Sequence, residues 1–173
     1  MRRIIAAALL LATTLAVAHG PTRQKVTETI TINAAPEAVW AVVKDFDKLQ
    51  AWHPAVESST ATQGNAVDSE RTLLLKGGGK VVEKLESWSE PDRKFSSRMR
   101  EAGPIPVSNY SSTLAVKPGP NAGTSVVEWR GAFYRGYPNN DPPPDKNDEA
   151  AVAAVTGIYK TGLANLKELV EKK

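Results

Sequence analysis

The sequence contains no cysteine and only two histidines, and aromatic residues make up 6% of it. Without cysteine the chain forms no disulfide, and the thiolate and imidazole ligands of zinc sites are almost entirely missing. Lys and Arg are scattered among Asp and Glu without a basic run, unlike a surface that binds nucleic acid. We therefore expect a fold held by packing alone, with no metal, no cofactor and no nucleic-acid partner.

The main apolar run of the chain lies near the N-terminus. Arg2 and Arg3 precede an apolar stretch that ends in an Ala-Val-Ala cleavage motif at residues 16–18, a pattern typical of a secretory signal peptide. The stretch is shorter than the roughly 20 residues that span a bilayer. We predict a cleaved signal peptide over residues 1–18, a periplasmic location without stable membrane insertion, and one domain over residues 19–173.

That domain begins as a strand followed by two short helices. Residues 26–32 alternate β-branched and polar side chains, which predicts a strand. Pro36 and Glu37 mark a helix start, and a second helical turn is expected over residues 45–50. Six further alternating runs, separated by turns rich in Gly and Pro, predict an antiparallel meander: residues 56–63, 70–76, 80–89, 94–100, 108–117 and 124–134.

A Pro-rich segment and a long amphipathic helix complete the chain. Residues 137–146 contain four prolines and are expected to form no regular structure. Asp145 or Asn147 then caps a helix whose apolar residues recur at three- and four-residue steps: Val152, Val155, Tyr159, Leu163, Leu166 and Val170. The predicted fold class is α+β: a curved seven-stranded antiparallel sheet around a long C-terminal helix, with two short helices between strands 1 and 2.

In the first helical region, residues 34–40 read Ala-Ala-Pro-Glu-Ala-Val-Trp, and Phe46 is followed by Trp52-His53-Pro54. These two motifs resemble those of the SRPBCC superfamily of START-like and polyketide cyclase-like domains. The resemblance covers the whole chain after the signal peptide and implies the helix-grip fold. The superfamily has no shared catalytic residues to transfer to this sequence.

The last predicted strand ends with Gly-Ala-Phe-Tyr at residues 131–134, and a Pro-rich loop precedes the last helix. In these two features the chain resembles the MxaD-like proteins within that superfamily. The resemblance implies a non-enzymatic periplasmic accessory protein of methanol oxidation, which assists the interaction of a quinone-dependent methanol dehydrogenase with its cytochrome c acceptor.

The Pro-rich loop supplies candidate residues for docking such periplasmic partners. Its prolines stiffen the backbone and so lower the entropic cost of docking. A rigid connector that covers a cavity entrance is the alternative. The candidate residues are Tyr137, Pro138, Pro142, Pro143 and Pro144.

Strand alternation predicts an apolar interior between the sheet and the helix. On the last strand Val127, Trp129 and Phe133 share one face, which should point at the helix. We expect aromatic and aliphatic side chains there, with hydroxyls as the only polar groups, forming either a filled core or the lining for an apolar ligand. The candidate cavity residues are Trp52, His53, Phe95, Met99, Tyr110, Trp129, Phe133 and Tyr159.

Three functions remain open at this point. The first is the accessory role, the second is a carrier of a lipid, a quinone or another apolar small molecule, and the third is an enzyme of cyclase or hydrolase type. The enzyme hypothesis uses His53 and Tyr110 as acid or base, but neither has an evident activating neighbour, so we assign no catalytic residue. The acidic residues at 141–149 lack the ligand spacing of a calcium loop.

Overall fold

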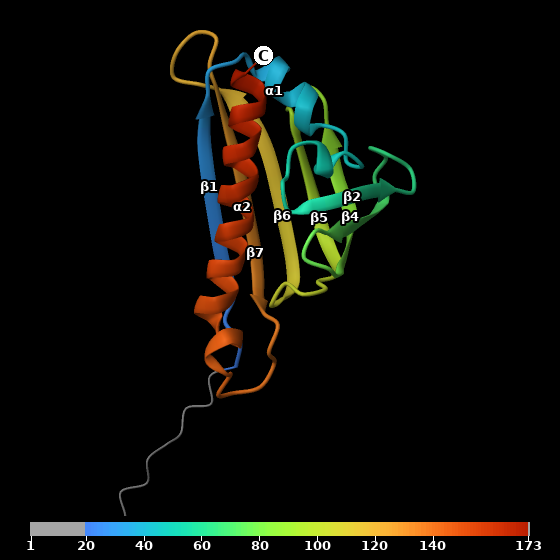
Figure 1. The fold of residues 1–173 in the computed structure, drawn as a ribbon, viewed down its shortest axis with the longest axis vertical. Helices are drawn as coiled ribbons and strands as arrows, with labels where there is room; N and C mark the ends of the chain where they lie inside the picture. Colours follow the sequence, from blue (N-terminus) through green and yellow to red (C-terminus); the bar gives the residue numbers. More distant parts are fainter. Residues whose placement is uncertain (1–19, 173) are drawn as a thin grey trace, which may run out of the picture.

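The computed structural model describes residues 20–172. The predicted signal peptide and His19 lie outside this range. Within it, no helix is both long and apolar enough to cross a bilayer. The elements follow the predicted order (Figure 1): β1 (Gln24–Ile32), α1 (Pro36–Val43), the 3₁₀ turn η1 (Leu49–Ala51), β2 (Val56–Ala61), β3 (Glu70–Leu75), β4 (Lys80–Ser89), β5 (Lys94–Glu101), β6 (Val107–Pro118), β7 (Ser125–Arg135), the 3₁₀ turn η2 (Pro144–Lys146) and α2 (Asp148–Glu171).

The strands form one antiparallel sheet in the order β1-β7-β6-β5-β4-β3-β2. β2 to β7 pair with their neighbours in sequence, because short turns can only join antiparallel strands, while β1 joins the far edge by pairing with β7. The pairings of β2, β4 and β6 each contain a register shift. Such irregularities bend a sheet, and Figure 1 shows the β2 end turned away from the direction of β1 and β7.

Helix α2 runs lengthwise along β1 and β7, on the concave side of the sheet, and packs on both strands (Figure 1). Its first turn is capped by Asn147, whose side-chain oxygen accepts a hydrogen bond of 2.7 Å from the Ala150 amide. One stripe of the helix is buried because its small and apolar residues recur at helical spacing: Ala151, Val155, Tyr159, Gly162, Leu163, Leu166 and Val170.

The predicted α+β helix-grip architecture is therefore present, with two local differences. The second helical turn is a 3₁₀ turn at Leu49–Ala51 rather than a turn over residues 45–50. The Pro-rich segment contains a 3₁₀ turn at Pro144–Lys146, so the expectation of no regular structure was wrong there. Pro144 occupies the first position of that turn, where its fixed φ fits and its missing N–H is not needed.

Candidate functional site

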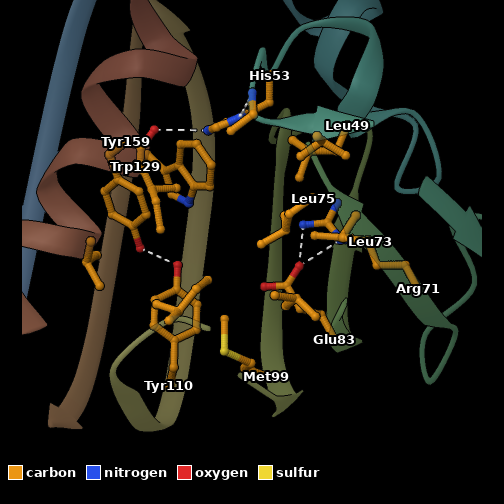
Figure 2. A pocket seen from close by; sticks show the side chains of 16 residues that line it. Leu49, His53, Arg71, Leu73, Leu75, Glu83, Met99, Tyr110, Trp129 and Tyr159 are labelled. Carbon is orange, nitrogen blue, oxygen red and sulfur yellow. Dashed lines mark hydrogen bonds and ion pairs between the residues drawn. The ribbon is translucent and has the colours of Figure 1, made fainter. Parts of the chain in front are cut away.

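A cavity of about 110 Å³ lies between α2 and the part of the sheet that curls toward it. Trp129 and Tyr159 line it on one side, and residues of β3 and β4 line it on the other (Figure 2). Ala55 is exposed at its rim, and Leu75, Ile105 and Ile158 are half-buried there. The cavity thus has an enclosed interior and a mouth that reaches the surface beside Ala55.

Stacked aromatic side chains form one wall of the cavity. The rings of Trp129 and Tyr159 are stacked, with centroids 4.3 Å apart and planes 12° from parallel. The Tyr159 hydroxyl lies 2.5 Å from the hydroxyl of Tyr110 on β6, in a buried hydrogen bond (Figure 2). Burial raises the pKa of both phenols, and the nearby Glu83 carboxylate adds to the effect at each. Both hydroxyls therefore stay protonated at physiological pH.

Two glycines allow this wall to form. Gly131 on β7 faces the Tyr159 hydroxyl, and a Cβ at that position would collide with it. Gly162 on α2 faces the His53 ring, where a Cβ would lie 2.5 Å from Cδ2. Each glycine is thus required by close approach of a side chain rather than by backbone conformation.

Replacing Gly162 with Ala is expected to destabilise the protein by about 1–3 kcal/mol through overpacking. The reason is that the new methyl group would force the His53 ring or α2 to shift. Gly157, in the same helix, faces open space, so Gly157→Ala should instead stabilise the protein by about 0.5–1 kcal/mol through helix propensity. Urea unfolding of both variants measures the difference, and equal effects at the two positions would contradict this account.

An ion pair is buried on the opposite side of the cavity. Arg71 on β3 and Glu83 on β4 stand directly opposite each other in the strand register, and their side chains are only 5% and 7% exposed. The Nε and Nη2 atoms of Arg71 donate to Glu83 Oε2 at 2.7 and 2.5 Å. Nη1 donates to the Phe46 carbonyl at 3.0 Å, and the guanidinium carbon lies 4.2 Å from the centre of the Phe46 ring.

This ion pair corrects the sequence prediction that hydroxyls would be the only polar groups of the interior. The strand pattern contained a signal for both residues: Arg71 has the same parity on β3 as Leu73 and Leu75, and Glu83 has the same parity on β4 as Val81. Alternation alone thus places both charges on the inward face.

His53 lines the cavity, and both of its ring nitrogens are hydrogen-bonded. Its Nε2 lies 3.0 Å from the Ile158 carbonyl, and its Nδ1 accepts a bond of 3.3 Å from the Ala55 amide. These partners select the neutral tautomer with the proton on Nε2. Burial lowers the pKa of His53, the Arg71 charge also lowers it, and the bond to Ile158 only partly opposes them. Both ring nitrogens are engaged by backbone groups, which leaves no lone pair to act as a base toward a ligand.

The lowered pKa of His53 predicts a loss of stability in mild acid. The unfolded chain takes up the proton as the pH falls through the ordinary value of 6.5, whereas the folded protein takes it up only at lower pH. The free energy of unfolding should therefore be constant above that value and fall below it, by at most about 1.4 kcal/mol per pH unit. Urea unfolding between about pH 5 and pH 8 measures this slope. His53→Gln should flatten it, and an unchanged slope in that variant would assign the effect to other groups.

The eight candidate cavity residues fall into two groups in the structure. Five of them line the cavity: His53, Met99, Tyr110, Trp129 and Tyr159. The other three, Trp52, Phe95 and Phe133, are buried beside it without lining it. Trp52 packs edge-on against Trp129, with ring centroids 5.6 Å apart, so it supports the cavity wall from behind.

The candidate docking loop after β7 is held by the buried side chain of Arg135, which the sequence analysis did not select. Arg135 donates to the backbone carbonyls of Tyr137 and Asn139, both at 3.0 Å, and to the Asp148 carboxylate at 3.2 Å. The loop residues Pro138, Pro143 and Pro144 are exposed, whereas Tyr137 and Pro142 are half-buried. None of these five loop residues lines the cavity, so the loop does not form the cavity entrance.

The site is a small apolar cavity whose polar lining groups include the Glu83 carboxylate and the phenol pair of Tyr110 and Tyr159. No cluster of three or more potential metal ligands occurs within the described part of the chain. His53 and Tyr110 both line the cavity, where His53 is hydrogen-bonded to backbone groups and Tyr110 to the hydroxyl of Tyr159.

Comparison with known proteins places this chain in a family. The family described as polyketide cyclase/dehydrase and lipid transport matches residues 23–171. The solved structure of the protein XoxI from Bacillus cereus is 32% identical in sequence, with a TM-score of 0.72, over 84% of this chain and 94% of that one. An uncharacterised protein from Bacillus thuringiensis is also 32% identical, with a TM-score of 0.73, over 85% of this chain and 98% of that one.

A more distant structure shares the fold alone. Norcoclaurine synthase from Thalictrum flavum, solved with dopamine and hydroxybenzaldehyde, is 14% identical with a TM-score of 0.65, over 99% of this chain and 98% of that one. The family match covers nearly all of the described residues, and the curled sheet and long terminal helix agree with it. The chain therefore belongs to the polyketide cyclase/dehydrase and lipid transport family of SRPBCC-type proteins.

Proposed function

We propose that this protein binds a small, largely apolar molecule in the cavity between α2 and strands β3 and β4. The observation that carries the proposal is an enclosed chamber lined mostly by apolar side chains and open at a mouth beside Ala55. Concave, mostly apolar sites with few polar groups are the usual form of small-molecule sites. The family description, which includes lipid transport, agrees with this activity.

The size of the cavity limits what it encloses. Sites for drug-sized ligands measure about 300–1,000 Å³, and an apolar cavity of about 150 Å³ holds one benzene molecule. The present cavity of about 110 Å³ is somewhat smaller than that, so it encloses a group no larger than one ring or a short branched chain. A longer ligand would place that group inside and the remainder at the mouth.

Blocking the mouth tests the proposal. Ring-sized probes such as benzene and fluorobenzene should raise the Tm of the wild type by a few degrees, because a ligand that binds only the folded state stabilises it. Ala55→Trp should abolish the shift, since Ala55 is exposed at the rim and its replacement fills the opening. Ala153→Trp is the matched control, because Ala153 is exposed on α2 and does not line the cavity.

The outcomes of this test are distinct. A shift that survives Ala55→Trp would place the binding elsewhere, and a wild type that responds to no ring-sized probe would reject the proposal. Native mass spectrometry of protein purified without denaturant adds an independent measurement, in which a bound small mass is expected.

We also propose that the chain is exported to the periplasm and serves there as a non-enzymatic accessory protein of methanol oxidation, with the loop after β7 as its docking surface. The resemblance of residues 131–134 and of the Pro-rich loop to MxaD-like proteins supports this role. The hydrogen bonds from Arg135 to the loop backbone also support this role, because a loop held in one conformation loses less entropy on docking.

The accessory role is tested with the purified partners. The protein should bind a quinone-dependent methanol dehydrogenase or its cytochrome c, and Arg135→Ala should weaken that binding by loosening the loop. Arg130→Ala is the control, because Arg130 is an exposed arginine on the same strand. The absence of binding to either partner would rule the role out without affecting the ligand proposal.

A further inference from the structure

Among residues 20–172, the Glu83 carboxylate accepts hydrogen bonds through only one of its two oxygens. Both hydrogen bonds from Arg71 end on Oε2. No group within residues 20–172 donates to Oε1, and Figure 2 shows this second oxygen directed away from Arg71 into the cavity. Glu83 lines the cavity, so Oε1 is open to a molecule inside it, and carboxylate oxygens in proteins are nearly always hydrogen-bonded to protein, water or ligand. A donor from outside the chain is therefore expected at this position when the cavity is occupied.

The charge of the site limits which donor fits. Arg71 neutralises Glu83, and Arg71 is itself held by the Phe46 carbonyl and ring. A cationic ligand would bring a net positive charge into an enclosed apolar site, and an anionic one would face the carboxylate. A neutral group with an O–H donor satisfies Oε1 without either cost.

The other side chains that line the cavity restrict the shape and polarity of the rest of the ligand. Leu73, Val81 and Val155 are buried aliphatic side chains of the lining, and the Trp129 ring forms the facing wall. The phenol pair of Tyr110 and Tyr159 stays protonated, so it adds no charge on the far side. A compact aromatic or branched aliphatic group would pack against these side chains without burying polar atoms that lack a hydrogen-bond partner.

We infer that the cavity is specific for neutral alcohols and phenols, whose hydroxyl donates to the free Oε1 of Glu83 while a compact apolar body fills the space beside Trp129. This inference rests on the proposed binding function and names the ligand class of the same cavity. It assigns Glu83 as the residue that determines specificity, with Arg71 as the group that positions and neutralises it.

Matched probe pairs test the inference. Phenol and fluorobenzene are similar in size, but only phenol has a donor, so wild type should bind phenol about tenfold more tightly or better, because its acceptor is charged. Benzyl alcohol and benzylammonium differ mainly in charge, and wild type should prefer the alcohol. Dissociation constants come from NMR titration of the tryptophan indole signals.

The double variant Arg71→Met/Glu83→Leu separates the polar contact from the cavity. Removing both charges together leaves no unpaired ion, so fluorobenzene should bind as in wild type and the preference for phenol should disappear. Glu83→Gln is a second variant of nearly unchanged shape, in which the preference for phenol should fall while fluorobenzene binding persists.

Each outcome has one meaning. Equal affinity for phenol and fluorobenzene in wild type would overturn the inference while leaving the proposed function intact, with water as the partner of Oε1. A phenol preference retained in the double variant would remove Glu83 from the recognition, and tight binding of benzylammonium would overturn the requirement for a neutral ligand. Binding of none of the four probes would reject the proposed function itself.

Discussion

Replacing Arg71 with Met is expected to lower the free energy of unfolding by about 3–5 kcal/mol, because it leaves a buried carboxylate without its counter-charge. Glu83 is 7% exposed, and Arg71 supplies both of the hydrogen bonds that its Oε2 accepts. Urea unfolding followed by circular dichroism measures the loss.

The matched double variant shows whether the loss comes from the unpaired charge. Arg71→Met/Glu83→Leu replaces both ions by apolar side chains of similar length, a change that is often neutral or stabilising for buried pairs. Its stability should return close to that of the wild type. A double variant as unstable as Arg71→Met would mean instead that the Arg71 contacts with Phe46 carry the stability.

Replacing Trp129 with Ala should cost about 3–5 kcal/mol, the range found when a large aromatic side chain is removed from a core. Trp129 is 6% exposed, stacks on Tyr159 and packs edge-on against Trp52. The loss should be measured against Tyr134→Ala, because Tyr134 is a half-buried aromatic on the same strand. A similar loss at both positions would show that Trp129 has no special part in the core.

Trp129→Ala should also change which ligands the cavity binds. Removing the indole merges its volume with the existing chamber, so the variant should bind a two-ring probe such as naphthalene that the wild type excludes. Thermal unfolding with and without naphthalene provides the measurement. If the variant does not bind naphthalene, the surrounding side chains have moved into the volume that the indole occupied.

Local sequence patterns were enough to predict the elements and their inward faces. The alternation of β7 placed Val127, Trp129 and Phe133 toward the helix, and all three are buried. The apolar spacing of the last helix predicted the stripe that includes Val155 and Leu166. These patterns are reliable because periods of two and of 3.6 residues follow from backbone geometry alone.

The site itself was predicted less completely than the fold. Trp52, Phe95 and Phe133 have the right type and face, but they pack behind the cavity rather than on its surface. Arg71 and Glu83 were available from the alternation of β3 and β4, and were missed because charged residues rarely point into a core. Their direct opposition depends on the register of two strands, which a short turn restricts without defining completely.

The sequence by itself determined the order of the elements, the inward face of each strand and the buried stripe of α2, because these depend on neighbours along the chain. The tertiary structure alone decided which side chains meet across the cavity: Tyr110 with Tyr159, and His53 with the helix at Ile158 and Gly162. These contacts join residues far apart in sequence, at distances set by how strongly the sheet curls around the helix. Curvature arises from the register shifts and twist of the whole sheet, and no local pattern specifies it.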